Sequence, residues 1–90
     1  MCQNACMRHI TPDELDRLED LLAALRETAG LREKKRGVFY RKSRAFLHFH
    51  EDPAGLFADV RLDGEAFERF RVTTKKEQRD LLARVRRAVE

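Results

Sequence analysis

The sequence predicts an α+β fold: an antiparallel four-stranded β-meander with an N-terminal and a C-terminal helix packed on one face. Three observations lead to this prediction. Apolar residues recur at helical spacing near both ends of the chain, and between these segments they alternate with a period of two. Turn residues divide the alternating region into four short runs. The predicted order of elements is therefore α-β-β-β-β-α.

The composition is that of a small globular protein. The chain has 90 residues, of which 42% are hydrophobic and 39% are charged. This length suits a single domain, and no apolar run approaches the roughly 18 residues of a membrane span. We therefore expect a soluble protein with no membrane partner. Since no apolar segment follows the first basic residue, we expect no secretory signal and a cytoplasmic location.

Residues 1–9 are expected to be a flexible N-terminal tail, and residues 10–90 the single domain. Because Cys2 and Cys6 precede every periodic segment, they cannot link distant elements, and we expect them to be reduced. With His9 they offer three metal ligands, whereas a closed zinc site needs four. Met7 lies just before the first helix signal and is a second candidate for the initiator methionine.

The first helix is predicted from the segment ITPDEL, in which Thr11 suits the N-cap, Pro12 the first helical position and Glu14 a capping box. The leucines that follow share one stripe, which seeks a core. They are Leu15, Leu18, Leu21, Leu22 and Leu25. Gly30 supplies the C-cap that ends this helix. A second capping box at Thr74 predicts the C-terminal helix.

Strands are indicated from Gly37 onwards, where β-branched and aromatic residues become frequent. Turn signals at Lys42-Ser43, Asp52-Pro53-Ala54-Gly55 and Asp63-Gly64 separate them. The predicted strands are residues 37–41, 44–51, 56–62 and 66–72. Short loops make consecutive strands antiparallel neighbours, so the side-chain alternation determines which residues share a face.

Closing the hairpins assigns Val38, Tyr40, Leu47 and Phe49 to the face that the helices cover, where Glu68 opposite Val60 is the misfit. It sets Phe39 beside Phe46 and forms two rows across the strands: His48, Asp59 and Arg69, and His50, Phe57 and Arg71. The other face, which we call the open face, combines aromatic, histidine and arginine side chains. Its predicted residues are Phe39, Phe46, His48, His50, Phe57, Arg61, Phe67, Arg69 and Arg71. Exposed aromatic area of this extent is uncommon on a monomer without a binding role.

A basic segment lies around the first predicted strand. Its cations are Arg32, Lys34, Lys35, Arg36, Arg41, Lys42 and Arg44, with Glu33 alone among them as an acidic residue. The formal net charge of the whole chain is only +3, so the charge is unevenly distributed. Such a run is either a solvated surface or a contact for phosphate or an acidic partner.

These observations favour a non-catalytic binding module whose aromatic and basic sheet face mediates homodimer formation or contact with a protein partner. Alternatively, the open face and the basic 32–44 segment bind nucleic acid, because aromatic rings stack on bases and cations neutralise phosphates. The sequence does not distinguish the two ligands.

A metal site and an enzyme are the less favoured interpretations. His48, His50 and Asp59 are the ligand types of a two-histidine, one-carboxylate metal site. Three arginines share their face, however, so a salt bridge between Asp59 and Arg69 is the simpler assignment, and no metal or cofactor is expected. Catalysis is not predicted either, because Ser43 lies in a hairpin loop without a positioned histidine and the glycines form no phosphate-binding pattern.

The order of elements, the size and the phrase VFYRKSRAFLHFHE, a short strand leading through a basic turn into a second strand, resemble the small bacterial YjbR-like proteins. The fold of that group is shared with CyaY and frataxin, and the likeness covers residues 37–90. Some YjbR-like proteins look like DNA-binding proteins, so the resemblance implies contact with DNA. The acidic ridge by which frataxins bind iron is not matched, because no second acidic strand accompanies the acidic residues of 13–20.

Overall fold

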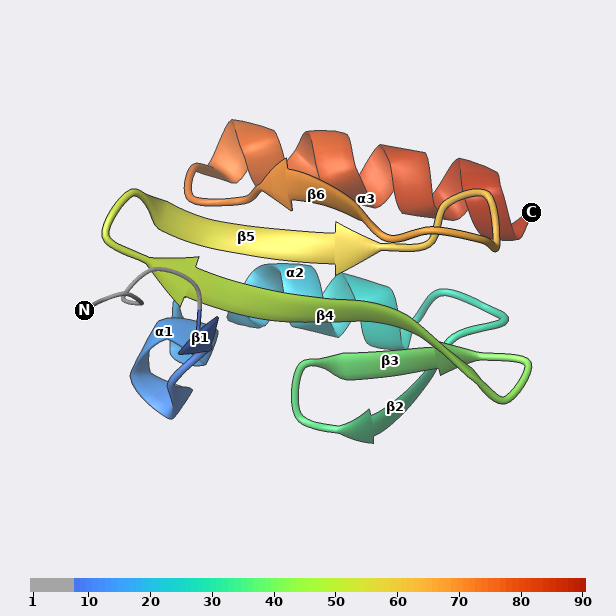
Figure 1. Ribbon diagram of the computed structural model, residues 1–90. Helices are drawn as coiled ribbons and strands as arrows, with labels where there is room; N and C mark the ends of the chain where they lie inside the picture. The colour runs from blue at the N-terminus through green and yellow to red at the C-terminus, as the bar shows by residue number, and fades with distance from the viewer. Residues whose placement is uncertain (1–7) are drawn as a thin grey trace.

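The computed structural model describes residues 8–90, which form an antiparallel sheet with helices α2 and α3 on one of its faces (Figure 1). The strands that neighbour one another in chain order are β2 (Arg32–Lys35), β3 (Val38–Arg41), β4 (Arg44–Asp52), β5 (Gly55–Val60) and β6 (Glu68–Arg71). The helices are α1 (Pro12–Asp16), α2 (Glu19–Arg26) and α3 (Lys75–Val89). The predicted α+β class with an antiparallel sheet is confirmed.

The predicted number of strands is too small. The four predicted strands correspond to β3–β6, and the sheet gains β2 at one edge and the two-residue strand β1 (Arg8–His9), which pairs with the second half of β4. The sequence predicts residues 8 and 9 to be part of the flexible tail, whereas they form β1. The rest of that predicted tail, with both cysteines and Met7, lies outside the described residues.

β2 has the sequence REKK, in which no apolar residue alternates and the β-propensity is low. It forms a strand because the chain turns back at Gly37, whose φ of 83° is the left-handed conformation that glycine adopts readily. The turn pairs β2 with β3, with Arg32 opposite Tyr40. Four charged residues at the edge of a sheet discourage pairing with a further chain.

The predicted N-terminal helix is interrupted. Thr11 is the N-cap of α1 and accepts a hydrogen bond from the Glu14 amide at 3.3 Å, as the sequence predicts. The amide of Thr11 donates to the Glu51 carboxylate on β4 at 2.7 Å, so the sheet also holds the N-cap residue in place. Helix α1 then ends, and the backbone leaves helical geometry at Leu18, whose φ is −102° and ψ 10°. Leu15 before this break and Leu18 at the break are both buried.

Helix α3 begins at the predicted capping box. The Thr74 hydroxyl accepts from the Glu77 amide at 3.1 Å, and the Glu77 carboxylate accepts from the Thr74 amide at 3.0 Å. The helix packs against α2 and β6 and buries Leu81 and Val85. The sheet contributes the other half of this core through Phe39, Leu47, Phe49, Leu56, Ala58, Val60 and Val72, which are buried.

Side-chain alternation predicts the β4–β5 and β5–β6 registers correctly, including the awkward pairing of Glu68 with Val60. The predicted β3–β4 register is wrong. Phe39 lies opposite Leu47, and the next pair is Tyr40 with Ala45, so one additional residue of β4, Phe46, is accommodated as a bulge. This shift turns Phe39 to the helix-covered face. In the described part of the chain, no helix combines the length and apolar character needed to cross a membrane.

Candidate functional site

The open face of β4, β5 and β6 carries two cross-strand rows that the sequence predicts. The rows are His48, Asp59 and Arg69, and His50, Phe57 and Arg71. Neither α2 nor α3 covers this side of the sheet (Figure 1). The face therefore presents its polar side chains away from the main helical layer.

The exposed aromatic area predicted for this face is wrong in two of its four residues. Phe39 is fully buried in the core, because of the shifted register, and Phe46 is only 3% exposed. The β5–β6 connection approaches Phe46: Arg44 at its side donates to the Gly64 carbonyl at 3.0 Å. Phe67 is the one large hydrophobic side chain within residues 10–90 that is classed as exposed, at 37%. The aromatic surface is thus much smaller than predicted.

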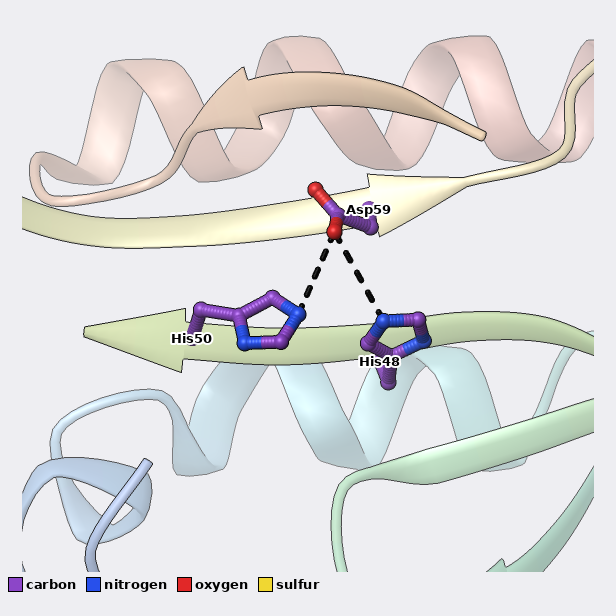
Figure 2. Close-up of side chains that lie close together, drawn as sticks. All are labelled: His48, His50 and Asp59. Carbon is purple, nitrogen blue, oxygen red and sulfur yellow. Dashed lines mark ion pairs between the residues drawn. The ribbon is translucent and has the colours of Figure 1, made fainter. Parts of the chain in front are cut away.

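Asp59 lies at the centre of a cluster of four side chains. Its carboxylate accepts two hydrogen bonds from Arg69, from Nε to Oδ1 at 2.8 Å and from Nη2 to Oδ2 at 2.9 Å. His50 Nε2 lies 3.2 Å from Asp59 Oδ2, and His48 Nε2 lies 3.6 Å from the same atom. Figure 2 shows both imidazole rings directed toward that oxygen. The predicted Asp59–Arg69 salt bridge is present.

Asp59 stays ionised although its side chain is only 9% exposed. Burial by itself raises the pKa of this carboxyl group, but the hydrogen bonds and charge of Arg69, with smaller contributions from His50 and His48, lower the pKa below its ordinary value. The same contact raises the pKa of Arg69. A charged oxygen atom is thus held between two imidazoles in a partly dehydrated place.

The other two arginines of the open face are directed to different groups. Arg61 donates to two backbone carbonyls at 2.8 and 2.9 Å, and its guanidinium lies 4.1 Å from the centre of the Phe67 ring. Arg71 pairs with Glu77 at the start of α3, with Nη1 and Oε2 3.0 Å apart. Of the three arginines, only Arg69 bonds to the Asp59 carboxylate.

The basic 32–44 segment divides into paired and unpaired cations. Arg36 bonds to Asp16 at 2.7 Å and to Glu19 at 3.1 Å, so its charge is compensated by the acidic first helices. The other six cations form no ion pair with any residue of 10–90. They are Arg32, Lys34, Lys35, Arg41, Lys42 and Arg44. Most of the charge of this segment is therefore available to an external ligand.

Part of this charge surrounds a hollow beside Tyr40, at the end of the molecule where the α2–β2 connection meets the β3–β4 turn. We call it the Tyr40 pocket; its volume is about 420 Å³. The lining residues are Gly30, Leu31, Arg32, Lys34, Tyr40, Lys42 and Ser43. None of them is acidic, and the Lys34 ammonium lies 5.2 Å from the centre of the Tyr40 ring.

Tyr40 and Ser43 were not predicted as site residues. Alternation predicts Tyr40 on the helix-covered face, but the shifted register turns its neighbour Phe39 to that face. Tyr40 therefore lies on the opposite side of the sheet, where its ring is half-buried. The sequence does contain an indication of this pocket. Lys42 and Ser43 occupy a two-residue turn, which folds the chain back on itself and brings the cations on both sides of the turn close to the preceding strand.

Comparison with known protein families, with curated proteins and with solved structures gives no match. The resemblance of residues 37–90 to the YjbR-like proteins therefore stays a prediction, and the functional argument rests on the geometry of the chain itself.

Proposed function

We propose that the protein is a non-catalytic nucleic-acid-binding module that holds single-stranded DNA or RNA at the Tyr40 pocket. The observation that carries this proposal is the gathering of Arg32, Lys34 and Lys42 around one aromatic ring with no acidic side chain in the lining. Cations without internal partners keep their charge for phosphates, and a ring supplies a surface on which a base stacks.

The distribution of ion pairs supports this location. The cations of the open face and of the start of α3 are held by acidic or carbonyl groups of the chain itself, as in the Arg69–Asp59 and Lys75–Asp20 contacts. A phosphate at those places competes with an existing partner. At the Tyr40 pocket it meets no such competition, so the electrostatic gain on binding is larger there.

The size of the pocket supports a single nucleotide unit. Its volume of about 420 Å³ lies at the lower end of the range of roughly 300–1,000 Å³ for small-ligand pockets. The flexible side chain of Lys34 covers the Tyr40 ring and is exposed, so a base can displace it and leave its ammonium group for a neighbouring phosphate.

Homodimer formation through the open face has lost most of its support. It required four phenylalanines on the surface, and Phe39 and Phe46 belong to the buried core. What remains is the exposed Phe67 with a half-buried Phe57, two aromatic side chains in place of the predicted four.

The proposal is tested by fluorescence anisotropy with labelled single-stranded and duplex oligonucleotides over a range of salt concentrations. We expect single strands to bind, with the logarithm of the association constant falling against the logarithm of salt with a slope of about −2, since three cations contribute about −0.7 each. Arg32→Gln/Lys42→Gln should weaken binding strongly and reduce that slope to about −0.7.

The matched control is Lys75→Gln/Lys76→Gln, which removes the same amount of charge from cations paired with Asp20 and Asp80. We expect this variant to bind nearly as well as the unchanged chain. Equal weakening of both double variants would show a response to net charge alone, and absence of binding at low salt would refute the proposal.

A further inference from the structure

We infer that His48, His50 and Asp59 form a binding site for a divalent transition-metal ion of the zinc type. This site is independent of the Tyr40 pocket and of the proposed nucleic-acid contact. The two histidines come from alternate positions of β4, and Asp59 comes from the neighbouring strand β5, directly opposite His48. Two imidazole nitrogens and one carboxylate oxygen are a ligand set that zinc and neighbouring metals accept.

The distances between the donor atoms approach those of ligands around one ion. One donor atom from each of the three residues lies within 4.8 Å of the other two. The Asp59 Oδ2 atom is 3.2 Å from His50 Nε2 and 3.6 Å from His48 Nε2. Ligand atoms bound about 2.1 Å from a tetrahedral zinc ion lie about 3.4 Å from one another. The two nitrogen–oxygen distances are near this value, and the three atoms, which lie within 4.8 Å of one another, need to move closer together when an ion binds.

A hydrogen-bonding role alone explains the arrangement less well. The 3.2 Å contact of His50 with Asp59 suits a hydrogen bond, but at 3.6 Å the contact of His48 is too long for one. Nevertheless both rings direct Nε2 toward the same carboxylate oxygen (Figure 2). The three donor atoms thus border one small region, in which a cation can replace the two N–H contacts with the oxygen once both imidazoles are deprotonated at Nε2.

The positive charge of the open face, which argues against a metal site in the sequence, is largely diverted in the structure. Arg71 is neutralised by Glu77, and Arg61 is directed to backbone carbonyls and the Phe67 ring. Arg69 does contact Asp59, but its Nε bond goes to Oδ1. An ion bound to Oδ2 displaces only the hydrogen bond from Arg69 Nη2. The hydrogen bond from Nε to Oδ1 remains and orients the carboxylate that binds the ion.

The surroundings favour binding because two of the ligands are largely shielded from water before an ion binds. The side chains of Asp59 and His50 are 9% and 16% exposed, so little is lost when they give up water. The His48 side chain is 29% exposed and leaves a path to solvent. Three protein ligands leave the fourth tetrahedral position for water or for an external group.

The test is titration of the full chain with Zn²⁺ by calorimetry, and with Co²⁺ by visible absorption. We expect one ion per chain, a Co²⁺ spectrum of low coordination number, and shifts of the His48 and His50 ring ¹⁵N resonances on adding Zn²⁺. His48→Ala and His50→Ala should each weaken binding by about 100-fold or more, since loss of a mere supporting partner already costs about 10- to 100-fold. His48 is the less buried ligand, so its variant keeps the test valid if a change at His50 or Asp59 impairs folding.

Two controls locate the ion. Asp52→Asn changes a carboxylate of the same strand outside the three-residue cluster, and it should leave affinity within about twofold, well below the effect of losing a ligand. Cys2→Ser/Cys6→Ser removes the cysteines of the N-terminal segment and should also retain binding. The inference is overturned if the unchanged chain shows no saturable binding at micromolar Zn²⁺, or if the cysteine variant loses binding while both histidine variants retain it.

Discussion

Phe39 fills the middle of the core between the sheet and its helices, with no exposed surface. Truncation of a fully buried phenylalanine removes its apolar contacts and leaves a cavity. We therefore expect Phe39→Ala to lower the free energy of unfolding by about 3–5 kcal/mol. Phe67→Ala is the matched control on the exposed side and should lower it by about 1 kcal/mol or less. Urea denaturation of both variants distinguishes them, and similar losses would contradict the assigned faces.

The same residue shows why one part of the site was beyond sequence analysis. Alternation predicts faces only while the register is regular, and nothing in the letters RAFLH indicates that Phe46 is accommodated as a bulge. The registers of β4, β5 and β6 are regular, so the neighbours His48, Asp59 and Arg69 were predictable to the residue. The burial of Phe39 and Phe46 was not predictable, because it depends on the bulge.

Gly55 opens β5 with a φ of 143°, and a methyl group built on it would collide with the Thr73 hydroxyl. That hydroxyl accepts a hydrogen bond from the Leu56 amide at 2.9 Å, so it has little freedom to move. We expect Gly55→Ala to destabilise the fold by about 2–3 kcal/mol, combining steric overlap with backbone strain. Gly64→Ala, where φ is 81° and no atom lies within 4 Å of the added methyl, should show the strain alone, about 1 kcal/mol. Thermal denaturation that ranks Gly64→Ala as the more harmful change would refute this account.

At the scale of elements, the β3–β4 turn combines conformational strain with charge. Lys42 and Ser43 have φ values of 53° and 73°, which asparagine and glycine adopt more readily. Lys42→Asn/Ser43→Gly should therefore raise the free energy of unfolding by about 0.5–1 kcal/mol. If the Tyr40 pocket binds nucleic acid, the same variant should bind more weakly, because one cation is lost. Ser43→Gly alone should also stabilise, and because it keeps the Lys42 cation it should weaken binding less than the double variant does; chemical denaturation and anisotropy on the three proteins test this difference.

The β2–β3 hairpin is attached to α2 through Glu33, which accepts hydrogen bonds from Arg26 at 2.6 Å and from the Gly37 amide at 3.0 Å. The Arg26 contact, ahead of the opposing effect of burial, lowers the pKa of Glu33 below its ordinary value. A carboxyl group with a depressed folded pKa stabilises the protein above its unfolded pKa. This contribution is lost as the pH falls through the lower, folded pKa.

Glu33→Gln should accordingly cost about 0.5–1 kcal/mol at neutral pH, and the difference from the unchanged chain should shrink below about pH 4. Urea unfolding at neutral and acidic pH measures it. Glu68→Gln removes an exposed carboxylate that makes no ion pair with residues 10–90, and its small effect should not depend on pH in this way. A pH-independent loss in Glu33→Gln would contradict the mechanism.

Elements with their own signals were predictable, and those formed by tertiary pairing were not. Capping boxes and leucine spacing indicate where α1 and α3 begin, because these signals act within a few residues. The REKK strand has no such signal and depends on pairing with β3. The break at Leu18 likewise follows from packing, since leucine spacing alone favours an uninterrupted helix.

On the scale of the whole molecule, acidic and basic regions are partly joined and partly separate. Helices α1 and α2 compensate Arg36 and Lys75 through Asp16, Glu19 and Asp20. The start of β2 and the β3–β4 turn meet at the same end of the sheet (Figure 1), and their cations Arg32, Lys34 and Lys42 form no ion pair with residues 10–90. The basic run was evident in the sequence, but which cations remain available depends on distant carboxylates, so the Tyr40 pocket could not be predicted.

Strand β1 differs from all others in how far along the chain its partner lies. Most strand pairs are hairpins between neighbours in the chain. β1 instead pairs with β4, and next to this pair the Thr11 amide bonds to Glu51, 40 residues further along the chain. Closing so long a loop loses more entropy than closing a hairpin. In native-state hydrogen exchange, we expect the amides of Arg8, His9 and Thr11 to exchange faster than those of Phe49 and Ala58 in the central β4–β5 pair. Equal protection would show that β1 opens only with the whole domain.

This long-range pairing has a consequence for biosynthesis. β1 leaves the ribosome well before β4 has been made, so it cannot pair until β4 has emerged. The meander can close strand by strand as the chain emerges, because its order in space follows its order in synthesis. The edge of β4 that carries His50 and Glu51 therefore stays uncovered until β1 pairs with it.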